Sequence, residues 1–140
     1  MNTSLDQLGK WPLSGEEARR NNRLVCIPPD KSLNVIHGKK NHILISFFVS
    51  NDYLHFGILQ IPQGTYSDPE EHKGDEVIFV IKGKLTVQTY EKGYDDKSLL
   101  HSTYDIAKEE QFLIPEGVRH RYLNFSKGVV KAVFGIAPAL

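Results

Sequence analysis

Residues 69–84, PEEHKGDEVIFVIKGK, hold the features on which both the fold and the site of this protein depend. The stretch begins with a cluster of acidic residues around one histidine and continues as an apolar strand that ends at a glycine. Charged side chains beside a buried strand are costly unless another group compensates their charge. The stretch therefore raises the question of what Glu70, His72 and Glu76 bind.

Strand patterns surround this stretch on both sides. From about residue 35 onward, segments rich in Ile, Val and Phe are separated by turn-type residues every eight to twelve residues or so, a spacing typical of antiparallel sandwiches and barrels. The sequence therefore predicts an all-β fold with little helix. The expected strands lie within residues 42–50, 53–61, 76–83, 84–91, 99–106, 110–117, 118–125 and 129–137.

Residues 1–34 are expected to form an N-terminal arm, and residues 35–140 the barrel domain. The arm is polar and interrupted by prolines, so we expect it to form a short helix or to be irregular. A helix is expected near residues 14–20, where Ser14 is a candidate N-cap and Glu17 stands at the matching third position. The single cysteine, Cys26, lies among apolar residues, and we expect it to be buried.

The overall composition excludes several classes of protein. The 140 residues suit one domain, and 17 basic residues balance 17 acidic ones, so neither nucleic acid nor an anionic membrane is an expected partner. The longest apolar run, residues 43–49, is far too short to span a bilayer. The first residues lack a basic region followed by an apolar core. The expected location is the cytoplasm.

Two spaced motifs carry the chemistry. The first reads Gly64, five residues, Glu70-x-His72, three residues, Glu76, six residues, Gly83. The second reads Pro115-x-Gly117, two residues, His120, three residues, Asn124.

Together these motifs resemble those of the cupin superfamily, G-x5-H-x-H-x3,4-E-x6-G and G-x5-P-x-G-x2-H-x3-N. The resemblance covers roughly residues 41–136 and implies a double-stranded β-helix, or jelly-roll, barrel. The chain departs from the pattern at two positions. Glu70 replaces the leading histidine of the first motif, and Glu109 replaces the leading glycine of the second. The second departure suggests a turn without positive φ.

In cupins, two histidines, a glutamate and the later histidine bind one metal ion. The resemblance therefore implies that His72, Glu76 and His120 are ligands, with Glu70 in the fourth place. The spacing agrees, because residues 70 and 72 lie on one face of a strand and a tight turn at 73–75 can return Glu76 to the same place. The expected cofactor is one divalent ion (Fe, Mn, Zn or Ni), with oxygen ligation favouring Mn²⁺ or Fe²⁺.

The role of Glu70 remains open at this point. It can bind the metal, contact a metal-binding residue without binding the metal itself, or point elsewhere. If it is uncoordinated beside an open metal position, it is a candidate general base. With two carboxylates bound, a divalent ion is neutralised and polarises water less, which disfavours hydrolysis. The alternative without any metal is a solvated hairpin tip at residues 70–76 and a surface histidine at 120.

The resemblance implies an enzyme of the isomerase, epimerase or dioxygenase type that acts on a sugar, sugar acid or keto acid. The alternative is a non-catalytic protein that binds or senses a small ligand, because the fold alone does not decide between them. Glu70 and Tyr122 are the candidate catalytic residues. A homodimer is expected, because small cupins commonly pair through N-terminal strands such as 43–49.

The remaining candidates are weaker. Gln88 and Tyr90 are expected to line a pocket. His55 and His101 either face the barrel interior or serve a structural role, with the structural role favoured. His37 and His42 flank the turn that contains GKK and are expected to be exposed.

Overall fold

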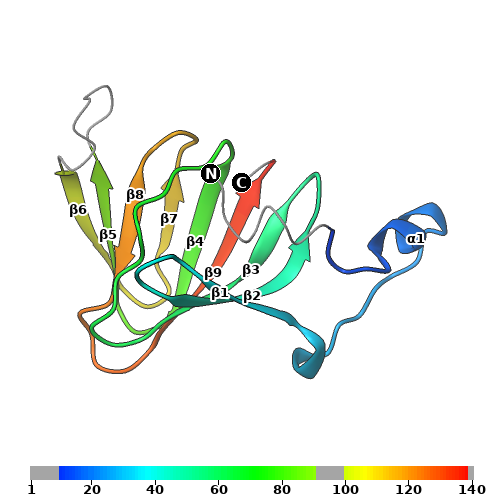
Figure 1. Cartoon of the computed structure of the whole chain (residues 1–140), viewed down its shortest axis with the longest axis horizontal. Coiled ribbons are helices and arrows are strands. Elements are labelled where there is room, and N and C mark those ends of the chain that lie inside the picture. The colour runs from blue at the N-terminus through cyan, green and yellow to red at the C-terminus, as the bar shows by residue number, and fades with distance from the viewer. Residues whose placement is uncertain (1–9, 91–99, 139–140) are drawn as a thin grey trace.

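The computed structural model describes residues 10–90 and 100–138, and within them nine strands form two antiparallel sheets. The sheets face each other as the two walls of a jelly-roll barrel (Figure 1). The larger sheet has the order β1 (Leu33–His37), β2 (Ile43–Ser50), β3 (His55–Ile61), β9 (Val130–Ala137), β4 (Asp75–Lys82) and β7 (Gln111–Ile114). The smaller sheet has the order β6 (Leu100–Ile106), β5 (Leu85–Tyr90) and β8 (His120–Leu123). The predicted all-β fold is confirmed.

The strands follow from alternating side chains. Along β9 buried positions alternate with partly exposed ones, and β2 and β3 repeat this pattern across the larger sheet. The inward side chains form one core in which Phe47 and Phe134 meet edge to face, with ring centroids 5.8 Å apart. Each fully buried large apolar side chain stabilises the fold by about 1.5–3 kcal/mol. The interior therefore holds the barrel together, and the site lies within it.

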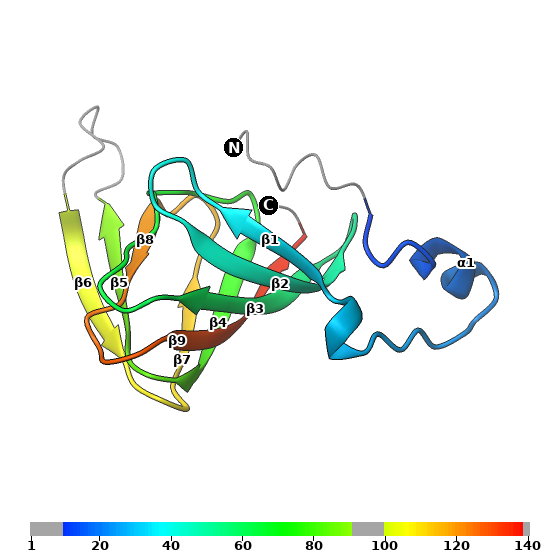
Figure 2. The same cartoon turned by 60° about the horizontal axis from the view of Figure 1, so that its bottom comes forward.

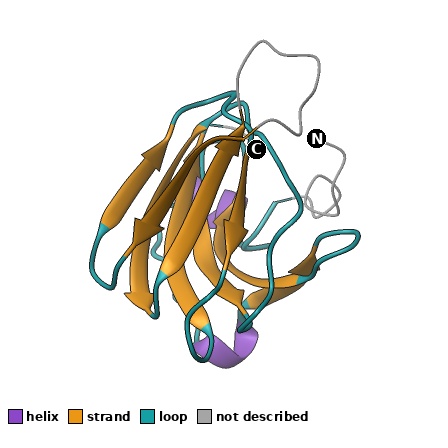
Figure 3. Cartoon of the chain, turned by 90° about the vertical axis from the view of Figure 1, so that its left-hand side faces the viewer, coloured by secondary structure: helices purple, strands orange, loops and turns teal. Residues whose placement is uncertain are grey.

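The described part of the N-terminal arm, from residue 10 to β1, extends away from the barrel (Figure 2). It contains the helix α1 (Gly15–Arg20) and the 3₁₀ turn η2 (Pro29–Lys31), which are the helical segments drawn in Figure 3. The described chain contains no helix long and apolar enough to cross a bilayer. Backbone hydrogen bonds between Trp11 and Ser50, 2.7 and 2.9 Å long, attach the start of the arm to the end of β2.

Two predictions about the arm are wrong. Ser14 stands at the N-cap of α1, but its side chain makes no capping hydrogen bond. Cys26 is exposed, because residues 23–28 extend along the arm without a barrel surface over them. An apolar local sequence buries a side chain only where a second element covers it.

The turn before β7 also differs from expectation. Glu109 has a φ of 72°, so it keeps the left-handed conformation that glycine adopts most easily. Its backbone N–H donates to the carbonyl of Val80 at 2.7 Å, and the Glu110 N–H donates to the carbonyl of Ala107 at 3.0 Å. The prediction of a turn without positive φ is therefore wrong, because these hydrogen bonds require the left-handed backbone whichever side chain is present.

The segment between β3 and β4, residues 62–74, crosses from the larger sheet to β8 in the smaller one. Isolated antiparallel bridges join Tyr66 to Leu123 and Glu70 to His120. At the second bridge the two residues exchange backbone hydrogen bonds of 2.8 and 2.9 Å. This crossing places the first motif directly beside the second.

Candidate metal centre

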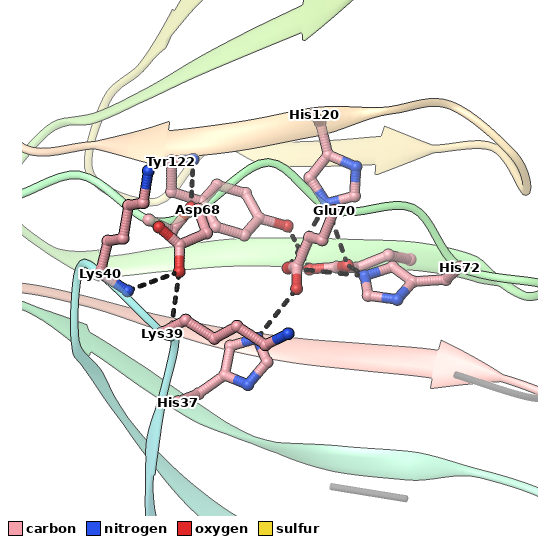
Figure 4. A network of polar contacts seen from close by, with 10 residues as sticks. His37, Lys39, Lys40, Asp68, Glu70, His72, His120 and Tyr122 are labelled. Atoms are coloured by element: carbon pink, nitrogen blue, oxygen red, sulfur yellow. Dashed lines mark hydrogen bonds and ion pairs between the residues drawn. The ribbon is translucent and has the colours of Figure 1, made fainter. Parts of the chain in front are cut away.

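Four predicted residues converge inside the barrel. Glu70 and His72 come from the crossing segment and His120 from the start of β8 (Figure 4). Glu76 comes from the start of β4. Each offers one ligand atom, and these atoms all lie within 4.8 Å of one another. Residues from both motifs thus form one cluster, as the resemblance implied.

The distances between the ligand atoms suit one shared ion. The Nε2 of His72 lies 2.9 Å from Glu76 Oε2 and 3.7 Å from Glu70 Oε1. The Nε2 of His120 lies 3.7 Å from Glu76 Oε2 and 3.8 Å from Glu70 Oε1. Atoms bound to one ion by bonds of about 2.0–2.2 Å are roughly 3–3.5 Å apart. The three longer distances exceed that spacing by a few tenths of an ångström, and all four ligand atoms lie within 4.8 Å of one another.

Unpaired buried atoms provide the test of whether a metal ion fits. His72 Nε2, Glu76 Oε2 and His120 Nε2 are buried and make no hydrogen bond. The first two are only 2.9 Å apart, yet they do not form a hydrogen bond with each other. Buried polar atoms without partners are rare in native proteins, and an ion is one of the groups that explain them. The donor set of two imidazoles and two carboxylates fits a divalent cation.

His120 is prepared for this role by its other ring nitrogen. Nδ1 lies 2.8 Å from the carbonyl of Val118, which can only accept, so Nδ1 carries the proton. In the neutral ring, Nε2 then carries a lone pair that is free to bind a metal ion. A hydrogen bond of this kind is the usual way in which a metal-binding histidine is oriented.

Glu76 is a buried carboxylate that keeps its charge. Burial, the largest influence, raises its pKa, but the neighbouring imidazoles of His120 and His72 outweigh it and lower the pKa to about 2. The Tyr122 hydroxyl donates to Oε1, which leaves Oε2 for the cluster. Burial raises the pKa of Tyr122 well above its usual range, and the Glu76 charge adds to this rise, so the phenol stays protonated.

A fifth polar residue joins the site from β1. The Nε2 of His37 lies 3.0 Å from Glu70 Oε2. Burial, the largest influence, lowers the pKa of His37, but the bond to Glu70 and its charge outweigh it and raise the pKa above the ordinary value.

The prediction that His37 is exposed is wrong, because only 9% of its surface is accessible. The sequence does contain a signal for this burial. Leu33 and Val35 are the inward residues of β1, and His37 continues their alternation. His42 is exposed, as expected.

One wall of the site is apolar. It is formed by side chains of the larger sheet, namely Ile43, Ile45, Leu59, Phe134 and Ile136. These residues border a pocket of about 310 Å³, a volume that includes open solvent at its mouth. The other lining residues are polar, namely Glu70, His72, Glu76, His37 and Tyr122. His37 pairs with Ile43 and Glu76 with Ile136, so polar and apolar lining residues adjoin within the larger sheet. Sequence reasoning did not identify this wall, although its residues lie on the inward face of the predicted strands.

The other candidate residues lie elsewhere. Gln88 accepts a hydrogen bond of 2.8 Å from Arg121, and neither Gln88 nor Tyr90 lines the pocket. His55 lies 2.9 Å from the Ser50 hydroxyl through its Nδ1, a contact of the structural kind. The side chain of His101 lies outside the described part of the structure.

Comparisons with known proteins agree with this architecture. A sequence model of a family described as Cupin domain matches residues 57–135, more than half of the chain. No curated protein matches the chain. An RmlC-like cupin from Shewanella frigidimarina shares 12% identity at a TM-score of 0.59, and the match covers 80% of this chain and 88% of that one.

Two further solved structures are similar. A protein from Bacillus halodurans has 24% identity and a TM-score of 0.55, with 64% of this chain and 65% of that chain covered. An oxalate oxidase has 23% identity and a TM-score of 0.51, with 61% of this chain and 42% of that chain covered. At these identities the similarity shows a common fold.

Proposed function

Because this chain belongs to the cupin family, we propose that it binds one divalent metal ion at the cluster of Glu70, His72, Glu76 and His120 and acts on a small oxygenated metabolite. The observation that carries the proposal is the set of three buried ligand atoms without hydrogen-bond partners. The oxygen-rich donor set favours Mn²⁺ or Fe²⁺, while Zn²⁺ and Ni²⁺ also suit imidazole ligands. When bound, the ion would polarise oxygen atoms of the metabolite.

Within the enzyme class we favour isomerisation over oxygenation. Glu70 is the more accessible of the two carboxylates, with 11% of its side chain exposed against 3% for Glu76. Where it is not bound to the ion, it is therefore the group placed to accept a proton from a carbon next to a carbonyl and to return it to a neighbouring position. Such a transfer consumes no co-reactant. Tyr122 contributes by holding Glu76 through its hydroxyl.

The apolar wall narrows the substrate class. Side chains such as Ile43, Leu59 and Phe134 offer no hydrogen-bonding partner to a ligand. A sugar would leave several hydroxyl groups unpaired against this wall, and unpaired buried polar groups are costly. A keto acid with a short aliphatic part suits the pocket better, with its oxygen atoms toward the polar cluster and its carbon chain on the wall.

A metal-content measurement tests the centre itself. Wild-type protein, His72→Ala and His120→Ala are purified from Mn²⁺-supplemented medium and analysed by inductively coupled plasma mass spectrometry. The proposal expects close to one ion per wild-type chain and loss of that ion in both variants. His42→Ala, which changes an exposed histidine outside the cluster, is the matched control. A full metal complement in His72→Ala and His120→Ala contradicts the proposed site.

The alternative function is binding or sensing without turnover. The observation in its favour is that both carboxylates already have a partner, since Glu76 accepts from Tyr122 and Glu70 lies against His37. No carboxylate then stands free to act as a base. Calorimetry with a panel of keto acids, followed by mass analysis of the recovered ligand, separates the two functions. An unchanged ligand after long incubation with metal-loaded protein supports the binding function.

We further propose a cytoplasmic homodimer. The larger sheet carries a row of residues paired in register across β3, β9, β4 and β7, namely Phe56, Gly135, Val77 and Leu113. The ring of Phe48 packs against that of Phe56 at a tilt, with centroids 5.6 Å apart. The large side chains of this row and Phe48 are 36–57% exposed, and exposed apolar patches commonly mark interfaces. Light scattering at micromolar concentration tests the proposal: Leu113→Lys is expected to shift the mass from dimer to monomer. A monomeric wild type contradicts it.

A further inference from the structure

The residue that departs from the family pattern within the site, Glu70, has a partner from a distant strand. His37 ends β1, 33 residues earlier in the sequence, and its Nε2 lies 3.0 Å from Glu70 Oε2. We propose that His37 is a positioning residue that holds Glu70 as a single-oxygen ligand. The inference rests on the metal centre proposed above and assigns a role that neither motif contains.

The two oxygen atoms of Glu70 face different neighbours. Oε1 lies 3.7 Å from His72 Nε2 and 3.8 Å from His120 Nε2, on the side of the ligand cluster. Oε2 lies on the side of His37 (Figure 4). When the imidazole donates its Nε2 proton to Oε2, the carboxylate presents Oε1 to the ion. Glu70 then occupies one coordination position, as the histidine of the family pattern does, and does not spread over two.

Glu76 is held in a comparable way. Its Oε1 accepts from the Tyr122 hydroxyl while Oε2 faces the cluster. In each carboxylate of the site, one oxygen therefore accepts a hydrogen bond from a side chain and the other is left to bind the ion. If the ion is six-coordinate, four single-atom ligands would leave two positions for oxygen atoms of a substrate, and two chelating carboxylates would fill those positions.

The position of His37 is fixed by the segment that carries Glu70. Asp68 accepts hydrogen bonds from the backbone N–H groups of Lys39 and Lys40, at 2.7 and 3.2 Å, and from the Asn41 side chain at 3.1 Å. The β1–β2 hairpin that begins just after His37 is thus tied to a residue two positions before Glu70.

Gly38 lets this hairpin turn tightly. Its φ is 117°, and a Cβ atom there would lie 1.8 Å from the carbonyl oxygen of Asn41. The backbone of the β1–β2 turn and that of the segment between β3 and β4 are therefore held together beside His37 and Glu70. The contact between these two side chains does not depend on a freely rotating surface side chain.

The test measures Mn²⁺ binding by the full-length protein, with affinity from chelator competition and the bound ion observed by electron paramagnetic resonance. His37→Leu removes the hydrogen bond, and His37→Gln keeps a donor at the same place. We expect His37→Leu to weaken Mn²⁺ binding by about 10–100-fold and to alter the spectrum, as loss of a ligand's hydrogen-bonding partner does in other sites. His37→Gln is expected to recover most of the affinity. His42→Leu, from the other end of the same hairpin, serves as the matched control.

A double variant separates positioning from general stability. If His37 acts through Glu70, adding His37→Leu to Glu70→Ala is expected to change the affinity by no more than about twofold, the usual limit for sites that no longer interact. A purely structural role predicts the same loss in both backgrounds, and that result overturns the inference. Wild-type affinity and spectrum in His37→Leu also overturn it.

The failure of this inference is distinguishable from failure of the metal centre. If His72→Ala loses Mn²⁺ while His37→Leu retains it unchanged, the centre stands and the role of His37 is wrong. If the wild type binds no Mn²⁺, or His72→Ala binds it as the wild type does, both proposals are wrong.

Discussion

The two motif segments each depart from the family pattern once, and the structure accommodates the two departures differently. In the first motif Glu70 replaces a histidine inside the site, and a histidine from β1 lies against it at 3.0 Å. In the second motif Glu109 replaces a glycine in the turn before β7, and the backbone keeps the left-handed conformation with a φ of 72°. At the first departure a side chain from another strand contacts the replaced residue, and at the second the backbone conformation is retained.

This difference shows what each position requires. At position 70 the side chain is the functional part, so a change in its charge and hydrogen bonding can be balanced by a neighbouring side chain. At position 109 the backbone conformation is the functional part, and no side chain elsewhere can change the steric preference of an L-residue. Compensation is therefore expected for Glu70, whereas residual strain is expected for Glu109.

The largest effect is expected where the second motif keeps the family residue. Asn124 donates to the carbonyls of Ile61 and Gly128, both at 2.8 Å, and accepts from Ser126. Asn124→Ala leaves these groups unpaired at a cost of about 1–3 kcal/mol each. We expect the free energy of unfolding, measured in urea, to fall by roughly 3 kcal/mol or more. Asn21→Ala, at an exposed asparagine, is the control with an expected change within about 0.5 kcal/mol.

An intermediate effect is expected when the family residue is restored at position 70. Glu70→His removes the carboxylate that faces His37 and leaves the Nε2 of that buried imidazole without its partner. In metal-free protein the free energy of unfolding is expected to fall by about 1–3 kcal/mol. Adding His37→Leu to Glu70→His is expected to recover more than half of this loss. If Glu70→His alone is as stable as the wild type, the compensation between residues 37 and 70 does not exist.

The smallest effect, and the one of opposite sign, is expected at position 109. Left-handed backbone costs a non-glycine residue about 1–2 kcal/mol. Glycine avoids this cost, but its unfolded chain has greater entropy, which offsets about 0.4–1 kcal/mol of the gain in stability. Glu109→Gly is therefore expected to raise the free energy of unfolding by roughly 0.5–1 kcal/mol in thermal or urea denaturation.

The neighbouring residue of the same turn provides the control for this prediction. Lys108 does not have a positive φ, so Lys108→Gly is expected to destabilise by about 0.5–1 kcal/mol. If both glycine substitutions lower the stability equally, the left-handed conformation of Glu109 carries no measurable strain.

Much of the site followed from local spacing. The interval between Glu70 and His72 and the short turn before Glu76 place three side chains together with little dependence on the rest of the chain. The position of His120 required knowledge of the second motif, because the bridge that joins it to Glu70 connects residues 50 positions apart. The resemblance to the family supplied that long-range information.

The two wrong predictions of side-chain burial have a common cause. Cys26 lies in an apolar stretch and is exposed, whereas His37 lies beside a polar turn and is buried. The apolar neighbours of Cys26 and the polar turn beside His37 both gave the wrong answer, although the alternation along β1 indicated that His37 is buried. Burial depends on which distant element covers a residue. The arm at residue 26 is not covered by the barrel, and the end of β1 faces the site.

The sequence by itself determined the alternation of strands and the ligand types of the two motifs, because side-chain periodicity and tight turns act over a few residues. The tertiary structure alone decided that His37 meets Glu70, that Tyr122 holds Glu76 and that an apolar wall borders the same pocket as most of the cluster. These contacts depend on strand order and register across two sheets. A hydrogen bond between distant strands forms only where the packing of the whole barrel brings donor and acceptor within about 3 Å of each other.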